Sequence, residues 1–454
     1  MNTATSPLAT KEGEELLAGW GGTAPSRAVV KKPTSVEEVQ EIVSTAGPRG
    51  VLARGLGRSY GDAAQDGGGT VINLEHLNTR TLKDGMLTAQ AGASLDEILK
   101  QIVPAGYFVP VTPGTRMITV GGAIGADVHG KNHHRDGTFG VHVSELELVT
   151  GTGETKTFTQ EHPEFWATVG GMGLTGVVTS ATFDLIEIET SLMCVDTERA
   201  NDLDAVMASM IAKDDGYRYS VAWIDSVATG ANFGRGVITR GEHATKDQLP
   251  NAHNDPLAYD AKILGTAPKV FPSGVLNRWT VRAFNEAWFR KAPKEKAGEL
   301  QSIGAFFHPL DGVQEWSRVY GPKGFLQYQF VVPDDAAHVV AIALKRLQAA
   351  GAPSFLTVLK RFGAANNAPL SFPQPGWTLA ADVPAGIVGL DDALDELDEL
   401  VQSEGGRLYL AKDSRMDPHM MQSTYPRLDE WKAMKQRMDP KGVFTSDLAR
   451  RLSL

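Results

Sequence analysis

Glycine is concentrated in the stretch "VLARGLGRSYGD" at residues 51–62, which also carries an arginine, a serine and a tyrosine. Gly55, Gly57 and Gly61 give the spacing G-x-G-x-x-x-G, one residue longer than the dinucleotide-binding pattern G-x-G-x-x-G. The residues that follow show no helical periodicity, so no helix start is expected to receive a pyrophosphate. Two interpretations remain: a nest of backbone N–H groups that binds an anion, or a tight loop between strands.

Two further glycine clusters favour a ligand. They are "PGTRMITVGGAIGADVHG" at residues 113–130 and "GGMGLTGVV" at residues 170–178. Each glycine forgoes side-chain burial and loses more conformational freedom on folding than other residues do. Close backbone approach to one long, phosphate-bearing ligand explains all three clusters together.

Composition excludes several other classes of protein. The chain has 454 residues, enough for two or three domains, and its formal net charge of −10 argues against binding to nucleic acid through phosphate neutralisation. Cys194 is the only cysteine, so an internal disulfide and a multi-cysteine metal site are impossible. No run reaches about 18 apolar residues and the N-terminus lacks a signal layout, so we expect a soluble or peripheral protein.

The elements expected to position these clusters alternate between short strands and helices, which indicates an α+β fold. Ser35 with Glu38 has the spacing of a capping box and predicts a helix over 35–48; a second capped helix is predicted over 94–106. Strands are predicted at 50–55, 69–74, 86–92, 143–158 and 176–188, with a glycine-rich turn at 119–130. Two units of a strand followed by a helix, Leu326–Ala350 and Trp377–Glu404, predict a second sheet with covering helices.

The order of these motifs resembles the FAD-binding domain of the vanillyl-alcohol-oxidase-type (VAO/PCMH-type) flavoproteins. The resemblance rests on "ARGLGRSYGD", "GGGTVINLEHLN", "AGASLDEIL", "TPGTRMITVGGAIGADVHG" and "FWATVGGMGLTGVVTSATF". More narrowly, "HGKNHH", "FLQYQFVVP", "APLSFPQPGW", "LYLAKDSR" and "VFTSDLARRL" are similar to the actinobacterial oxidases of decaprenylphosphoryl-β-D-ribose. The resemblance covers nearly the whole chain.

The resemblance implies a two-domain fold. Residues 1–193 and a C-terminal return at 407–454 would form the FAD-binding domain, and residues 194–406 would form a separate substrate domain of a sheet with helices. The residues implied to contact FAD are Ala53, Arg54, Gly55, Leu56, Gly57, Arg58, Ser59, Tyr60, Gly61, Asp62, Ala63, Gly114, Thr119, Val120, Gly121, Gly122, Ala126, Asp127, Val128, His129, Val178 and Tyr409. Some relatives attach FAD covalently through a histidine at the position of Arg58; arginine cannot form that bond, so we expect non-covalent FAD.

The implied activity is oxidation of the ribose C2 hydroxyl to a 2-keto sugar, the first step of an epimerisation that supplies arabinose for cell-wall arabinan. An NADH-dependent short-chain reductase would complete it. Lys412 is the first choice for the base that accepts the hydroxyl proton, with Tyr60 and His129 as alternatives. The implied substrate contacts are Gln327, Gln329, Lys360, Thr378, Ala380, Lys412 and Trp223. A soluble sugar-alcohol or aldonolactone oxidase of the same superfamily is the alternative.

Three local features modify this interpretation. His129, His133 and His134 in "HGKNHH" lack the further ligands of a zinc site, so no metal is expected. Several relatives have a cysteine at the position of Ala380, so inhibitors that bond to that thiol should bind here only reversibly. The basic, aromatic segment 276–296 is either a solvated helix or a membrane-contacting one, which would place the protein peripherally on one face of the plasma membrane.

Overall fold

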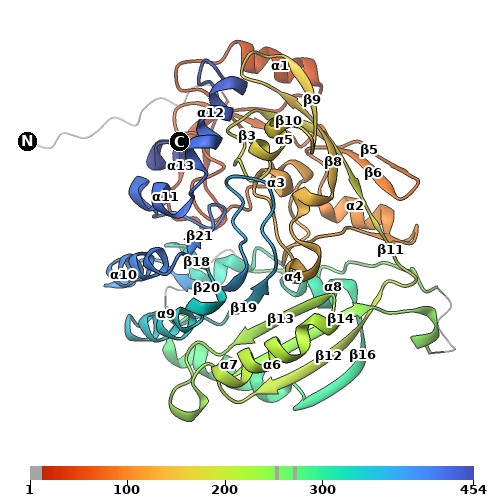
Figure 1. Cartoon of the computed structure of the whole chain (residues 1–454), viewed down its shortest axis with the longest axis vertical. Coiled ribbons are helices and arrows are strands. Elements are labelled where there is room, and N and C mark those ends of the chain that lie inside the picture. The colour runs from red at the N-terminus through yellow and green to blue at the C-terminus, as the bar shows by residue number, and fades with distance from the viewer. Residues whose placement is uncertain (1–12, 251–254, 269–273) are drawn as a thin grey trace, which may run out of the picture.

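Three larger β-sheets and the helices that cover them make up the computed structural model, which describes residues 13–250, 255–268 and 274–454 (Figure 1). The first sheet has the order β1-β2-β4-β3. In it β1 (Glu14–Leu17) is antiparallel to β2 (Ser26–Lys31), and β4 (Thr70–Asn73) is parallel to both β2 and β3 (Val51–Arg54).

The second sheet is antiparallel and comes from the same half of the chain. Its order is β5 (Arg80–Lys83), β6 (Met86–Gln90), β10 (Val177–Asp184), β8 (Val143–Val149) and β9 (Thr155–Thr159). Two short strands, β7 (Tyr107–Phe108) and β11 (Ile186–Glu187), pair beside it.

Helices α1 (Val36–Ser44) and α2 (Leu95–Ile102) begin where their capping residues predict. Ser94 and Glu97 form the full reciprocal box, each side chain accepting the other's backbone N–H at 3.2 Å. At α1 the Ser35 hydroxyl accepts from the Glu38 N–H at 3.3 Å, but the Glu38 carboxylate binds the N–H of Thr34 instead of that of Ser35. The other helices of this half are α3 (Val120–Gly125), α4 (His133–Asp136) and α5 (Pro163–Thr168).

Helix α3 replaces the glycine-rich turn expected at 119–130, so that expectation was wrong at this point. Glycine costs about 1 kcal/mol relative to alanine inside a helix, which is why the pattern favoured a turn. Thr119 caps the helix by accepting the Gly122 N–H at 3.1 Å, and a Cβ atom at Gly121 would lie only 3.0 Å from the Ala91 Cβ. Glycine at position 121 thus allows the helix to approach Ala91 closely. The packing gained there outweighs the low helix propensity of glycine.

The third sheet is antiparallel and has eight strands. Its order is β16 (Glu295–Ser302), β12 (Leu192–Ala200), β14 (Gly236–His243), β13 (Tyr219–Ile224), β19 (Thr357–Phe362), β20 (Gly376–Pro384), β18 (Phe325–Val332) and β21 (Arg407–Leu408). A short parallel pair joins β15 (Gly265–Thr266) to β17 (Val313–Gln314). The associated helices are α6 (Leu203–Lys213), α7 (Arg278–Lys291), α8 (Ile303–Phe307), α9 (His338–Ala349) and α10 (Leu390–Ser403). Short 3₁₀ helices lie at Phe139–His142, Asp214–Gly216, Gly230–Asn232, Lys246–Gln248, Pro309–Gly312, Trp316–Tyr320 and Asp334–Ala336.

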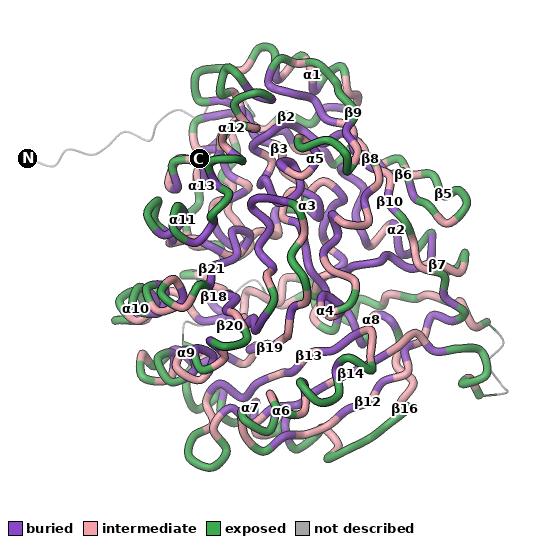
Figure 2. Tube along the Cα trace, in the orientation of Figure 1, coloured by how far each residue is buried: buried purple, intermediate pink, exposed green. Residues whose placement is uncertain are grey.

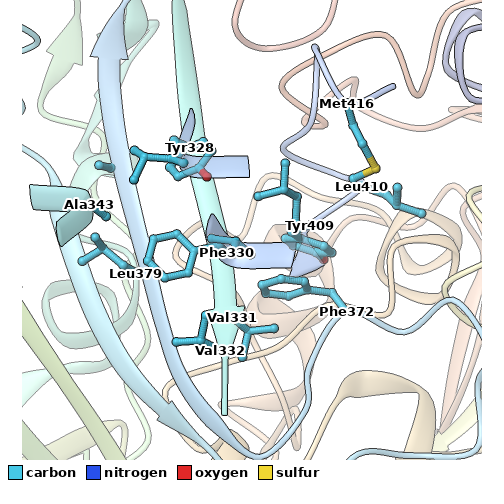
Figure 3. Packing of buried hydrophobic residues seen from close by; sticks show 14 of the residues in the cluster. Tyr328, Phe330, Val331, Val332, Ala343, Phe372, Leu379, Tyr409, Leu410 and Met416 are labelled. Atoms are coloured by element: carbon cyan, nitrogen blue, oxygen red, sulfur yellow. The ribbon is translucent and has the colours of Figure 1, made fainter. Parts of the chain in front are cut away.

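The two faces of this sheet have different environments. Helices α9 and α10 pack on each other and cover one face, where Phe330 and Leu379 lie in a continuous apolar core with Ala343 of α9 (Figure 3). The exposed residues of both helices lie on the outer side, away from the buried strands (Figure 2). The other face carries Gln329 and Ala380, which are directly paired across β18 and β20, and it is turned toward the N-terminal half.

The C-terminal residues return to the N-terminal half (Figure 1). Strand β21 is paired with β18, and the following chain accepts the Tyr60 N–H through the Ala411 carbonyl at 2.9 Å. Helices α11 (Pro418–Thr424), α12 (Leu428–Met438) and α13 (Asp447–Leu452) follow; α12 packs on α5, and Phe444 makes a parallel bridge to Val51 of β3. From these contacts we propose that residues 407–454 complete the FAD-binding domain.

Candidate active site

A cavity of about 660 Å³ lies between the N-terminal half and the open face of the eight-stranded sheet. Its wall combines the loop 53–60, the loop 112–119, residues of α3, the turn 172–178, strands β13, β14, β18, β19 and β20, and the tail at 409–412. The volume lies within the range of about 300–1,000 Å³ that is typical of ligand and cofactor sites. All three glycine clusters noted in the sequence contribute to this one cavity.

The glycines of the first loop are required by close contacts. A Cβ atom at Gly55 would lie 2.3 Å from the Thr119 Oγ1, and Gly57 has a φ of +64°, which disfavours other residues. The loop therefore presents backbone to the cavity, as the ligand-binding interpretation predicts. The Arg58 guanidinium lies 3.9 Å from the centroid of the Trp20 ring, and its Nε is buried without a hydrogen-bond partner among the described residues.

Most of the residues expected to contact FAD line the cavity: Ala53, Arg54, Gly55, Leu56, Gly57, Arg58, Ser59, Tyr60, Ala63, Gly114, Thr119, Gly121, Gly122, Ala126, Val128, His129, Val178 and Tyr409. Tyr409 also holds the chain after α3, because its hydroxyl donates to the Ala126 carbonyl at 2.7 Å.

Four others, Gly61, Asp62, Val120 and Asp127, lie behind this wall as the described residues form it. Asp62 pairs with Arg451 at 2.7 Å, and a Cβ atom at Gly61 would meet the Asp413 carbonyl oxygen at 2.0 Å. Val120 packs in the core.

Asp127 links separate segments of the chain through buried hydrogen bonds. Its fully buried carboxylate accepts hydrogen bonds from the Gly140 N–H at 3.1 Å, the Asn366 amide at 2.7 Å and the Ser371 hydroxyl at 2.5 Å. It therefore ties the chain after α3 to the segment 366–371 instead of facing the cavity.

The residues expected to contact substrate share the open face of the sheet. Gln327, Gln329, Lys360, Ala380 and Trp223 line the cavity with Lys412. The seventh, Thr378, lies just behind them and accepts a hydrogen bond from the Gln329 amide at 3.3 Å.

His129 lies at the centre of one group of interacting polar side chains. Its Nε2 lies 3.1 Å from the Gln329 Nε2, and its Nδ1 lies 3.0 Å from the Lys360 Nζ. Burial, and next the nearby Lys360 cation, hold the pKa of His129 well below its usual range. The low pKa favours the neutral imidazole, which has a single acceptor nitrogen, and both the Gln329 Nε2 and a charged Lys360 Nζ are donors; His129 therefore accepts a hydrogen bond from only one of them at a time.

Lys412 lies at the centre of a second group of interacting side chains. Its Nζ lies 3.8 Å from the centroid of the Tyr60 ring, and the Tyr60 hydroxyl accepts from the Gln327 Nε2 at 3.2 Å. Burial lowers the pKa of Lys412 to about 8, although Asp382 opposes the shift, and burial raises the pKa of Tyr60 well above its usual value. Of the three predicted bases, Lys412 alone changes protonation close to neutral pH.

Sequence reasoning missed Lys131, Trp20 and the segment 309–316, all of which line the cavity. Burial lowers the pKa of Lys131 to about 7, and its Nζ lies 4.2 Å from the centroid of the Phe306 ring. Lys131 lies in the motif "HGKNHH", in which the sequence suggested only the histidines as site residues.

The other two histidines of that motif bind backbone atoms. His133 Nδ1 accepts the Gly363 N–H at 3.2 Å, and His134 Nε2 lies 2.9 Å from the Tyr217 carbonyl oxygen. Across residues 13–250, 255–268 and 274–454, no group of three His, Cys, Asp or Glu side chains is arranged to hold a metal ion.

Comparison with known proteins identifies the family. A family model described as an FAD binding domain matches residues 27–159, and one described as D-arabinono-1,4-lactone oxidase matches residues 389–452. The decaprenylphosphoryl-β-D-ribose oxidase of Mycolicibacterium smegmatis is 45% identical over the full length of both chains. The chain belongs to the decaprenylphosphoryl-β-D-ribose oxidase family. An alditol oxidase from Streptomyces sp. is 24% identical over 96% of this chain and 98% of that enzyme.

As a member of the decaprenylphosphoryl-β-D-ribose oxidase family, the chain is an FAD-dependent oxidoreductase of the VAO/PCMH fold, as its motifs predicted. The residues present fit the cofactor. The glycine backbone of the first loop faces the cavity, and the unpartnered Nε of Arg58, within the described chain, is a donor for an anionic group. None of the described helices combines the length and the apolar character needed to cross a membrane.

Proposed function

We propose that this enzyme oxidises the C2 hydroxyl of decaprenylphosphoryl-β-D-ribose to the 2-keto sugar. The observation that carries the proposal is a cavity that joins a glycine-lined cofactor cradle to a group of half-buried lysines. The 45% identity to a decaprenylphosphoryl-β-D-ribose oxidase over the whole chain supports the choice of substrate.

The lysines favour an anionic substrate. Lys131, Lys360 and Lys412 all line the cavity, and burial together with the other two cations lowers the pKa of Lys360 to about 7. An anion placed among desolvated cations stabilises their charged forms. A sugar that carries a phosphodiester therefore suits this site better than a free sugar alcohol does.

The loop around Gly55, the loop before α3 and Tyr409 would hold FAD, with Arg58 as a charged donor and no covalent bond. When bound, FAD supplies the acceptor for the hydride that leaves C2. The protein supplies the proton acceptor: Lys412, as the neutral amine, takes the proton of the C2 hydroxyl. Gln327 and Gln329 provide amides on the same sheet face to orient the sugar.

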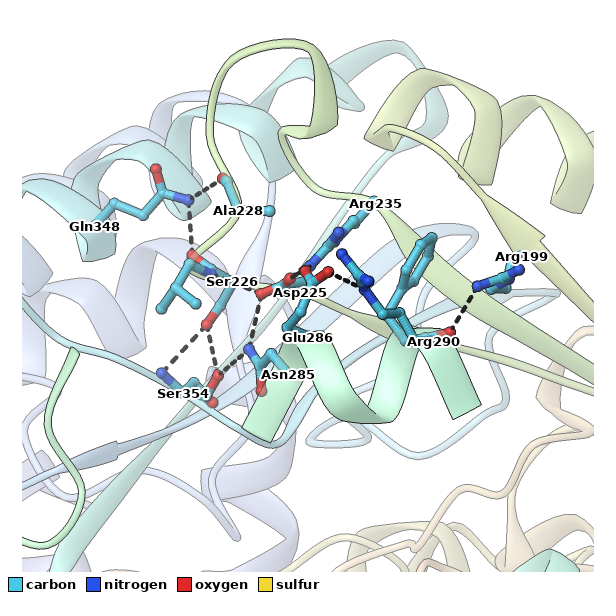
Figure 4. Close-up of polar contacts among 12 residues, drawn as sticks. Arg199, Asp225, Ser226, Ala228, Arg235, Asn285, Glu286, Arg290, Gln348 and Ser354 are labelled. Carbon is cyan, nitrogen blue, oxygen red and sulfur yellow. Dashed lines mark hydrogen bonds and ion pairs between the residues drawn. The ribbon is translucent and has the colours of Figure 1, made fainter. Parts of the chain in front are cut away.

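Helix α7 supports a peripheral contact with lipid. Its buried face is fixed by Asn285, whose amide donates to the Asp225 Oδ1 at 2.8 Å, and by the ion pair of Glu286 with Arg235 (Figure 4). Its outer surface exposes Trp279, Phe284 and Trp288, together with the basic residues Arg278, Arg282, Arg290 and Lys291.

Trp288 also lines the cavity, so the apolar surface of α7 continues into the active site. A polyprenyl chain leaving the cavity there would pass directly to a membrane.

A reductase must complete the epimerisation, because the oxidation leaves a ketone at C2. We propose an NADH-dependent short-chain reductase as this partner and the surface of the plasma membrane as the place of action, which together would provide arabinose for the cell wall. The resemblance that predicted the substrate is the basis for both.

The experiment compares substrates under anaerobic conditions. Purified holoenzyme is mixed with farnesylphosphoryl-β-D-ribose, a short-chain analogue, or with xylitol or an aldonolactone, and bleaching of the flavin's visible absorption is followed. We expect rapid bleaching with the lipid-linked sugar alone.

A soluble sugar-alcohol or aldonolactone oxidase is the second candidate, favoured by the match of residues 389–452 to D-arabinono-1,4-lactone oxidase and by the alditol oxidase relative. Faster bleaching with a free sugar, and peroxide formed on adding oxygen, would establish it instead.

The membrane contact is tested by flotation with anionic vesicles. Charge reversal on α7 (Arg282→Glu with Lys291→Glu) should abolish co-flotation while leaving flavin content intact. The matched control, Arg346→Glu on the exposed side of α9, should float like the wild type. Equal flotation of all three proteins would contradict the contact.

A further inference from the structure

Asp382 is a buried carboxylate beside the active site that none of the preceding roles uses. It stands on β20 directly opposite Gln327 of β18, and it is fully shielded from solvent. The Gln327 Nε2 donates to the Asp382 Oδ1 and also to the Tyr60 hydroxyl. The second oxygen, Oδ2, is buried without a hydrogen-bond partner in the described part of the chain.

Three titratable groups interact with this carboxylate: Lys412, Tyr60 and Tyr320. Lys412 is the cation among them, and its Nζ lies over the Tyr60 ring. Burial raises the pKa of Asp382 to about 7, against the opposing effects of the Gln327 amide and Lys412. Asp382 in turn opposes the effect of burial on Lys412, so the two groups stabilise each other's charged forms.

A buried carboxylate with an unpaired oxygen lowers the stability of the fold unless its charge is paired and hydrogen-bonded. Replacing Asp382 by a neutral residue would remove that cost while keeping the sheet pairing. Its carboxylate is linked to the Tyr60 hydroxyl through Gln327, and Lys412 lies over the Tyr60 ring, so the negative charge stands at the end of the cavity where the reaction would deposit a proton.

We propose that Asp382 is a positioning residue for proton removal, whose carboxylate fixes the Tyr60 hydroxyl through Gln327 and balances the positive charge that Lys412 gains on accepting the substrate proton. This inference rests on the proposed function. In the step, the O–H bond of the C2 hydroxyl breaks and its proton goes to the Lys412 Nζ. The C2–H bond breaks and its hydrogen leaves with the bonding electron pair as hydride, for which bound FAD would be the acceptor; the electron pair of the broken O–H bond forms the second C–O bond of the ketone.

The test removes the charge without changing the size of the side chain, in Asp382→Asn. An asparagine Oδ1 can still accept from Gln327, and its amide replaces the oxygen that lacks a partner. Loss of the anion should lower the pKa of Lys412, because an opposite charge nearby favours the charged form of the amine. The rate of flavin reduction by farnesylphosphoryl-β-D-ribose should therefore begin to rise at correspondingly lower pH.

A second readout needs no substrate. The holoenzyme is trace-labelled with acetic anhydride at a series of pH values, and modification of Lys412 is measured by peptide mass spectrometry. The labelling curve of Asp382→Asn should move to lower pH, and that of the charge-retaining Asp382→Glu should stay near the wild-type position. The matched control is Asp398→Asn, a buried carboxylate paired with Arg415, which should leave the Lys412 curve unchanged.

Coincident Lys412 labelling curves for wild type and Asp382→Asn would overturn the inference, as would an equal shift in Asp382→Glu. Absence of flavin reduction in the wild type would instead contradict the proposed function. The two failures are therefore distinguishable.

Discussion

The pH dependence of the reductive half-reaction follows from the environment of Lys412. Burial depresses the pKa of this lysine to about 8, so the amine fraction is about one tenth at pH 7 and about nine tenths at pH 9. A rate that depends on the amine should rise about tenfold over this interval and then level off. The rate rises with pH because the active form of the base is the deprotonated amine.

The alternatives predict different profiles. The pKa of His129 lies well below its usual range and that of Tyr60 well above, so neither changes protonation between pH 7 and 9. Lys131 and Lys360 have pKa values of about 7, and their titration would place the rise a unit lower.

The decisive perturbation is Lys412→Met, which keeps the length of the side chain and removes the proposed base. General-base catalysis contributes about 10²–10⁴-fold, so the anaerobic rate of flavin reduction should fall by that factor and lose its rise near pH 8. Stopped-flow mixing with farnesylphosphoryl-β-D-ribose measures both. The exposed Lys323→Met serves as the control and should match the wild type. A Lys412→Met rate within about threefold of wild type, or a persisting rise near pH 8, would refute the assignment.

Other predictions concern the cofactor, the inhibitor site and the fold. Because arginine cannot form the covalent linkage, acid precipitation should leave all FAD in the supernatant; flavin in the pellet would contradict this. Ala380→Cys should place a thiol in the cavity, where iodoacetamide alkylates it and bound substrate protects it from alkylation. The wild type should gain no adduct on this strand. A wild-type adduct there, or no protection of the variant by substrate, would contradict the position of Ala380. Asp127→Ala leaves the donors of Gly140, Asn366 and Ser371 without their acceptor, and it should lower the free energy of unfolding by roughly 2–5 kcal/mol in chemical denaturation. A loss under about 0.5 kcal/mol would show that these hydrogen bonds do not stabilise the fold.

Local sequence signals predicted the starts of the capped helices well. Ser35 and Ser94 each accept a hydrogen bond from the N–H three residues later, since capping depends on a few adjacent atoms. Helix α3 escaped prediction because its stability comes from packing against Ala91, which local propensity does not describe.

The site was predictable mainly where the family motifs are contiguous. The loop around Gly55 lines the cavity as expected, whereas Asp127 in an equally glycine-rich segment turns inward to Asn366 and Ser371. Asp382 and Lys131 were missed because their chemistry arises from burial and from neighbours remote in the chain. The pairing of Gln327 with Asp382 depends on the register of two strands that sequence patterns alone do not fix.

We conclude that this enzyme oxidises a lipid-linked ribose in this cavity with bound FAD. The most direct measurement is the visible spectrum of the purified protein before and after anaerobic addition of farnesylphosphoryl-β-D-ribose, followed by identification of the sugar product by mass spectrometry. We predict a flavin spectrum that bleaches fully and a product two hydrogens lighter with a ketone at C2. A protein without flavin absorption, or one that bleaches with xylitol but not with the lipid-linked ribose, would contradict the account.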